Sequence, residues 1–321
     1  MTINRTKKHA LQLSSIIVIV LLFSFFHQFY TSNHQSFNSL IFKIDTLNNI
    51  LIPQSKSINY AQKNKNATND HILLPLKSGK FTSLILPNFS VYKNTNEKKK
   101  AFFNFLKPFI TDENKRIVKQ RLFIEEQFKL LHAKESHSKE SVLNLESFIR
   151  DYRCNSSDLE KEETYNELLE RVDIIPHELA LVQAALESSW GSSYFALLGN
   201  NLFGLWCFKP GCGLVPRARK AGETHQVAKF KNLSLNVQAY MLFLNSHPLF
   251  RDLRDSRAKS RANGQTPSSF EMAKGLKAYS ARGNKYIGEV QSMIKTNKIF
   301  LNDIGKTDKA FGLSAINAES N

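Results

Sequence analysis

Apolar residues recur with the spacing of α-helices through most of the chain after Asn96, and this pattern constrains the fold more than any other feature. A Gly- and Pro-rich segment from Leu205 to Phe230 interrupts it and predicts a few short hairpins. The expected helices lie at residues 97–110, 111–133, 141–152, 157–174, 176–190, 234–246, 267–279 and 284–298. The pattern therefore predicts an α+β fold, predominantly α, with a small β-hairpin excursion.

Several of these helices carry signals for their ends. Ser157 and Glu160 have the spacing of a capping box, and Thr266 precedes a proline as an expected N-cap. Pro176 suits the first position of a helix, and Gly191 suits its end.

The N-terminus holds an apolar segment at 11–29 that follows Arg5, Lys7 and Lys8. Its length is at the lower edge of what crosses a bilayer, and no small-residue cleavage site follows it. We expect an uncleaved signal anchor within residues 1–30, with a removed signal peptide as the alternative; either exports the rest of the chain. The remaining expected organisation is a flexible linker at 31–84, a helical support region at 85–174, the main domain at 175–300 and a tail at 301–321.

The chain is strongly basic, with a formal net charge of +16. An exported basic protein is expected to meet an anionic envelope polymer or lipid headgroups rather than nucleic acid. Cys207 and Cys212 bracket the turn sequence FKPG, which predicts a disulfide across a tight hairpin and leaves Cys154 over. No spacing typical of a zinc site accompanies these cysteines, so no metal or other cofactor is expected.

A single carboxylate, Glu187, ends an apolar, alanine-rich helical run. Partial burial beside Leu186 and Trp190, together with the negative end of the helix dipole, is expected to raise its pKa. A carboxyl group that holds its proton near neutral pH suits glycoside hydrolysis, which needs a general acid at the leaving oxygen. A capping or salt-bridging role is the structural alternative.

Aromatic and amide side chains follow Glu187 closely. Aromatic faces stack on sugar rings, and amides hydrogen-bond to hydroxyl or N-acetyl groups. The glycines between them favour a lined cleft over a packed helix face. The expected substrate-binding residues in this segment are Trp190, Asn200, Asn201, Phe203 and Trp206.

The motif ALESSWGSS followed by GNNLFGLW resembles the catalytic signature of glycoside hydrolase family 73, the bacterial endo-β-N-acetylglucosaminidases. The flanks, including LPNFSVYKNTNEKKKAFFNFLKPFI, are similar to the Bax subgroup of that family, so the likeness covers about residues 85–300. It implies a lysozyme-like fold and cleavage of peptidoglycan between GlcNAc and MurNAc, with Glu187 as the general acid. Together with the expected signal anchor, it predicts a catalytic domain in the periplasm of the bacterial cell envelope, anchored in the inner membrane.

The family's C-terminal pattern resembles AYSARGNKYIGEV, which implies a catalytic role for Tyr279 and a substrate-binding role for Tyr286. The two tyrosines are seven residues apart here against six in the family pattern, so which of them faces the scissile bond stays open. Glu223 is the only acidic residue between Glu187 and Asp252, and we expect it to be the second catalytic carboxylate. If it is not, the N-acetyl group of the substrate is the expected nucleophile.

Two other functions fit the sequence. A lytic transglycosylase or muramidase would cut the other backbone bond of peptidoglycan, and a non-catalytic wall-binding scaffold would use the basic charge alone. The intact Glu-containing signature argues against a scaffold, because a binding module has no need of a partly desolvated acid.

Overall fold

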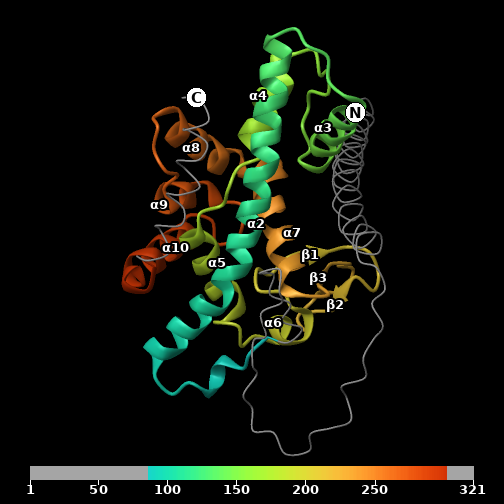
Figure 1. Cartoon of the computed structure of the whole chain (residues 1–321). Coiled ribbons are helices and arrows are strands. Elements are labelled where there is room, and N and C mark those ends of the chain that lie inside the picture. The colour runs from blue at the N-terminus through green and yellow to red at the C-terminus, as the bar shows by residue number, and fades with distance from the viewer. Residues whose placement is uncertain (1–85, 302–321) are drawn as a thin grey trace, which may run out of the picture.

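The computed structural model describes residues 86–301, and within them helices dominate (Figure 1). The helices are η1 (Phe89–Val91), α2 (Thr95–His132), α3 (Lys139–Asp151), α4 (Glu162–Arg171), α5 (His177–Ser188), α6 (Tyr194–Gly199), α7 (Leu233–Ser246), η2 (Pro248–Phe250), α8 (Arg251–Ala262), α9 (Ser269–Met272), η3 (Ala273–Leu276) and α10 (Asn284–Thr296). Three short strands complete the fold: β1 (Trp206–Cys207), β2 (Gly213–Leu214) and β3 (Gln226–Ala228). The predicted α-rich α+β class is confirmed.

The expected signal anchor, linker and tail lie outside the described residues. Between residues 86 and 301, no helix has both the length and the apolar character needed to cross a membrane.

Helix α2 runs the length of the molecule, with α8, α9 and α10 on one side and α3 and the sheet on the other (Figure 1). It packs against α4, α5 and α7, so the expected support region and main domain share one hydrophobic core. The prediction of two helices meeting near residue 110 was wrong. The buried apolar face continues through Ile110, Ile117 and Ile124, and Pro108 is accommodated inside the helix.

Helix α4 begins at Glu162, five residues after the expected capping box at Ser157, so that prediction was also wrong. The backbone amides of Asn155 and Ser156 donate to Oε2 of Glu167 at 2.8 and 3.1 Å. Glu167 lies on α4, so these hydrogen bonds tie the segment before the helix to the helix itself. The helix begins only after that segment.

The other helix ends differ by smaller amounts. Pro176 is the N-cap of α5 rather than its first residue, and Ser189 ends that helix in the left-handed region. Ser268 caps α9 in place of the expected Thr266, and the expected helix at 267–279 divides into α9 and the 3₁₀ turn η3. Helices α6 and α8 were not predicted.

The sheet is antiparallel with strand order β1-β3-β2, so β3 is central and the two flanking strands do not pair with each other. The expected tight hairpin between Cys207 and Cys212 is therefore absent from the described residues, although the disulfide is present with a Cα–Cα distance of 6.2 Å. Gly213 allows the close pairing, because a Cβ there would lie 2.1 Å from the Val227 carbonyl oxygen.

Candidate active site

Glu187 lies in the last turn of α5, and the chain reverses directly after it. Ser189, Trp190 and Gly191 all have positive φ, between 51° and 74°. The reversal is fixed by Ser188, whose Oγ accepts from the Gly191 amide at 2.7 Å. A Cβ on Gly191 would lie 2.8 Å from the Phe89 ring, so only glycine fits there. Strained backbone of this kind concentrates at functional sites.

The Glu187 side chain lines a cavity of about 530 Å³. Its walls are mostly apolar and aromatic, as in most carbohydrate and small-molecule sites. The lining residues are Arg153, Glu187, Phe203, Gly204, Leu205, Trp206, Phe208, Phe243, His247, Leu249, Ala278, Tyr279, Ser280 and Ala281. Glu187 is thus the one carboxylate among the described residues that line this cavity.

Burial raises the pKa of Glu187 above its usual value, as the sequence predicted. A hydrogen bond from Tyr286 and the positive charge of Arg282 act in the opposite direction, and the negative charge of Glu289 adds to the rise. Arg282 is itself paired with Glu289 rather than with Glu187. The net effect is a raised pKa for the carboxyl group that faces the cavity.

A chain of buried side chains positions Glu187 from behind. The Tyr240 hydroxyl donates to Oε1 of Gln183 at 2.7 Å, and Nε2 of Gln183 donates to the Tyr286 hydroxyl at 3.0 Å. Gln183 lies one helical turn before Glu187 on α5. Burial also raises the pKa of Tyr286 well above its ordinary range, so its hydroxyl keeps its proton. Because this hydroxyl accepts from Gln183, its proton is available for the hydrogen bond to Glu187.

The loop after α6 closes over the carboxyl group. A Cβ on Gly204 would lie 3.3 Å from Oε2 of Glu187, so this glycine lets the loop approach the carboxyl group closely. The loop is held by Tyr279, whose hydroxyl donates to the Phe203 carbonyl at 2.8 Å. Phe203 in turn stacks on Tyr240 with 3.8 Å between ring centroids. Phe203 and Tyr279 both line the cavity. Because the Tyr279 hydroxyl is engaged by the Phe203 carbonyl, the expected catalytic role of Tyr279 stays a prediction.

Trp206 forms part of the cavity wall on β1 and is 51% exposed. One face of its indole stacks on the His225 imidazole, with centroids 4.1 Å apart and planes 13° apart. A large exposed aromatic side chain that is held flat is suited to stack on a sugar ring. This placement supports the predicted substrate contact.

Two other predicted aromatic contacts lie elsewhere. Trp190 packs against Phe102 and Phe103 of α2, with Nζ of Lys99 over its ring, and does not line the cavity. Tyr286 is fully buried behind Glu187 and stacks on Tyr279. Both placements favour structural support over contact with substrate.

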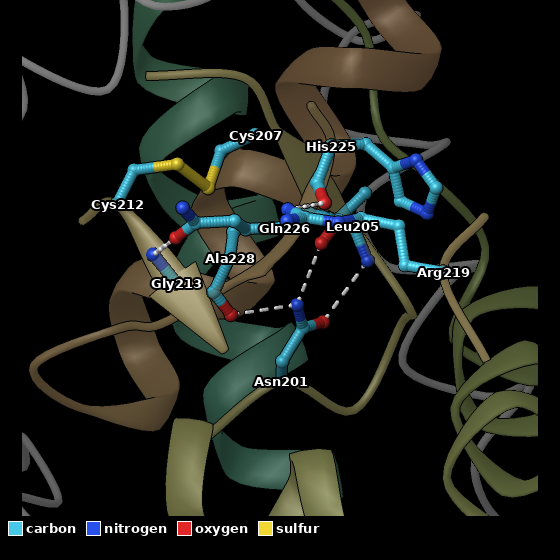
Figure 2. Close-up of a disulfide and its surroundings, with 9 residues drawn as sticks. All are labelled: Asn201, Leu205, Cys207, Cys212, Gly213, Arg219, His225, Gln226 and Ala228. Atoms are coloured by element: carbon cyan, nitrogen blue, oxygen red, sulfur yellow. Dashed lines mark hydrogen bonds between the residues drawn. A yellow bond between two sulfur atoms is a disulfide. The ribbon is translucent and has the colours of Figure 1, made fainter. Parts of the chain in front are cut away.

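The two predicted amides also serve the fold. Asn201 is buried, and its Nδ2 donates to the carbonyls of Leu205 and Ala228 at 2.8 and 2.9 Å while its Oδ1 accepts from the Leu205 amide (Figure 2). Asn200 is the left-handed C-cap of α6 and donates to the Phe230 carbonyl. Their hydrogen bonds fasten the loop to the sheet, so their placement does not support the expected substrate contacts.

Glu223 lies in an exposed turn outside the cavity. Its Oε2 accepts from the Lys220 amide at 3.1 Å and lies 3.7 Å from Nδ1 of His225. Its contact with the site is therefore indirect, through the imidazole that supports Trp206. This placement does not support its expected role as second catalytic carboxylate.

The Cys207–Cys212 disulfide ties the end of β1 to the start of β2 (Figure 2). Beside it, Oε1 of Gln226 accepts from the Gly213 amide at 2.9 Å. The covalent link thus braces the strand that carries Trp206.

Arg153, Phe243, His247 and Ser280 are among the cavity residues that were not predicted. Arg153 follows α3, Phe243 and His247 lie at the end of α7, and Ser280 follows Tyr279. Arg153, Phe243 and His247 stand in no recognisable motif. Ser280 had a signal, its position inside the segment AYSARGNKYIGEV.

The comparisons with known proteins agree with this geometry. A family model for glucosaminidases, described as mannosyl-glycoprotein endo-beta-N-acetylglucosaminidase, matches residues 162–299. Protein bax of Escherichia coli (strain K12) is 33% identical over 214 residues, which cover 66% of this chain and 74% of that protein. No solved structure matches the chain significantly. The chain therefore belongs to glycoside hydrolase family 73, and is a glycoside hydrolase of the endo-β-N-acetylglucosaminidase type.

Proposed function

We propose that the protein hydrolyses peptidoglycan at the bond between GlcNAc and MurNAc, with Glu187 as general acid. The single observation that carries this proposal is a carboxyl group with a raised pKa on an aromatic cavity of about 530 Å³. Glu187 donates its proton to the glycosidic oxygen as the bond breaks. Positioned proton transfer of this kind contributes about 10²–10⁴-fold to the rate.

The second catalytic function belongs to the substrate in this proposal. No other carboxylate lines the cavity among residues 86–301, and Glu223 faces outward. Substrate-assisted glycosidases solve the same problem with the N-acetyl group. Its carbonyl oxygen attacks the anomeric carbon as Glu187 protonates the leaving oxygen, and water then opens the cyclic intermediate with retention of configuration.

The site of action follows from the same reading. Peptidoglycan glycan strands are the proposed substrate, and the bacterial cell envelope is the proposed location. We retain the N-terminal segment as the proposed inner-membrane anchor, with the catalytic domain in the periplasm. The net charge of +16 suits work on an anionic polymer.

The test is digestion of purified sacculi with the full-length chain, followed by mass spectrometry of the muropeptides. Wild type is expected to release fragments with GlcNAc reducing ends, and Glu187→Gln to lose at least about 10²-fold in rate. Glu223→Gln is the matched control and is expected to keep its activity.

Other products would contradict parts of the proposal. Anhydro-MurNAc ends would indicate a transglycosylase acting at the other bond. Tight sacculus binding without any released fragment would indicate a scaffold. Equal rates for wild type and Glu187→Gln would remove Glu187 from the chemistry, and loss of activity in Glu223→Gln would restore the second carboxylate.

A further inference from the structure

Arg153 brings a positive charge into the wall of the Glu187 cavity from outside the family-matched residues 162–299. It directly follows α3 and its cap Tyr152, and has φ 57°, in the left-handed region. Glycine is the usual residue at this position after a helix, and an arginine there carries a conformational cost.

The backbone next to Arg153 is held rigidly. Nη1 of Arg171 donates to the Tyr152 carbonyl at 3.3 Å and to the Ser246 carbonyl at 2.8 Å. These carbonyls belong to the residues immediately before Arg153 and His247, the two basic residues of the cavity wall. One buried guanidinium therefore fixes both basic residues relative to each other.

The charge of Arg153 is not balanced by an ion pair in the described part of the chain. Within residues 86–301, no carboxylate forms an ion pair with it, and the carboxylate of Glu167 is engaged by Arg171 and Asn155. Partial burial and the repulsion from Arg171 both lower the pKa of Arg153. A desolvated and repelled cation gains more than a surface cation from an anion that enters the cavity.

We propose that Arg153 is a specificity-determining residue that binds a carboxylate carried by the glycan strand, an inference that rests on the proposed function. A guanidinium binds a carboxylate through two parallel hydrogen bonds. Two sources supply this group in peptidoglycan: the lactyl carboxylate of a muramyl residue without a stem peptide, and the carboxylates of the stem peptide itself. Chains of GlcNAc alone have neither.

The test compares full-length wild type, Arg153→Ala and Arg153→Lys on three substrates. These are peptide-bearing strands, strands stripped of their peptides, and the stripped strands after reduction of their carboxylates to alcohols. Arg150→Ala is the matched control, because Arg150 is an exposed arginine in the last turn of α3, the helix that precedes Arg153.

Arg153→Ala is expected to lower kcat/KM about 10- to 100-fold on a carboxylate-bearing substrate, mainly through KM, since a hydrogen-bonded charged group contributes on this scale. It is expected to match wild type on the reduced strands. Arg153→Lys is expected to recover part of the loss, and Arg150→Ala to resemble wild type throughout. A larger loss on stripped strands identifies the lactyl carboxylate, and a larger loss on peptide-bearing strands identifies the peptide.

An equal loss on charged and reduced strands would overturn the inference, because it would mean a structural role. The salt dependence of wild-type KM gives a second readout that needs no variant: KM is expected to rise with ionic strength on charged strands and to stay constant on reduced ones. Failure of the proposed function is distinguishable, since wild type would then release no GlcNAc ends from any substrate.

Discussion

At the scale of single residues, the protonation of Glu187 depends on neighbours that are far away in the sequence. Gln183 lies on the same helix, whereas Tyr240 belongs to α7 and Tyr286 to α10. The sequence predicted the raised pKa from the helix dipole and from burial beside Leu186 and Trp190, and Trp190 points away toward α2. Burial is the correct cause, but the tertiary fold supplies it.

Tyr286→Phe is expected to move the alkaline limb of the pH–rate profile to higher pH. The Tyr286 hydroxyl lowers the pKa of Glu187, so its removal raises that pKa further and the acid stays protonated to higher pH. The variant also leaves the Gln183 amide without this acceptor, at a cost of about 1–3 kcal/mol in the free energy of unfolding.

The measurement is kcat/KM against pH, with Tyr279→Phe as the control. The Tyr279 hydroxyl donates to a backbone carbonyl instead of to Glu187, so its removal should leave the position of the limb unchanged even if the rate falls. A shift of the Tyr286→Phe limb to lower pH would contradict the assignment of Glu187 as the acid.

At the scale of elements, the spacing of apolar residues predicts well those helices that bury an apolar face. Helix α8 was missed because its buried face carries arginines: Arg254 and Arg257 are 1% exposed, and Arg261 continues the same spacing. Their guanidinium groups reach carbonyls such as those of Leu244 and Asp173. The spacing of apolar residues cannot predict a helix whose buried face consists of arginines hydrogen-bonded to backbone carbonyls.

The small sheet shows the same limit for the site. Its Gly- and Pro-rich sequence predicted short strands and the Cys207–Cys212 bridge, but the strand order depends on which edges β3 can pair. The sequence also predicted that Trp206 contacts a sugar, but it did not predict the His225 ring that stacks on the indole. Local sequence signals select candidate residues, and tertiary packing decides which of them face the cavity.

Trp206→Ala is expected to raise KM for glycan about 2- to 10-fold, because an aromatic contact contributes roughly 0.5–1.5 kcal/mol. Stability should change little, since the indole is 51% exposed. Val215→Ala is the matched control, as Val215 is 52% exposed beside the sheet and does not line the cavity. Steady-state kinetics measure KM for glycan in both variants. The same KM for the two would show that Trp206 does not contribute to substrate binding.

At the scale of the whole molecule, Asp173 joins elements that are distant in sequence. Its carboxylate accepts from Nε and Nη2 of Arg261 at 3.0 and 2.8 Å and lies 3.7 Å from Nη1 of Arg121. These arginines belong to α8 and α2, so one buried anion connects both to the loop between α4 and α5. Burial alone would raise the pKa of Asp173, but the surrounding arginines lower it well below its usual range.

Asp173→Asn is expected to lower the free energy of unfolding at pH 7 by about 3–5 kcal/mol, since it leaves buried cations without their anion. The folded-state pKa is depressed, so the wild-type advantage is present above the unfolded pKa of about 4 and is lost as pH falls through the folded value. Urea unfolding from pH 7 downward measures it.

The control is Asp158→Asn, which breaks the exposed pair with Lys161 and should cost about 0–1 kcal/mol. A difference between wild type and Asp173→Asn that persists unchanged into strong acid would show that lost packing, and not lost charge, is responsible.

The position of α2 has a consequence for how such enzymes can be divided and recombined. The match to the family model starts at residue 162, yet α2 covers α5 and α7, and its Phe102 and Phe103 hold the turn that follows Glu187. A domain that begins at residue 162 would lack α2 and would expose the apolar surface of α5, the helix that carries Glu187. Fusion proteins that contain an active domain of this kind are expected to retain the long helix that corresponds to α2.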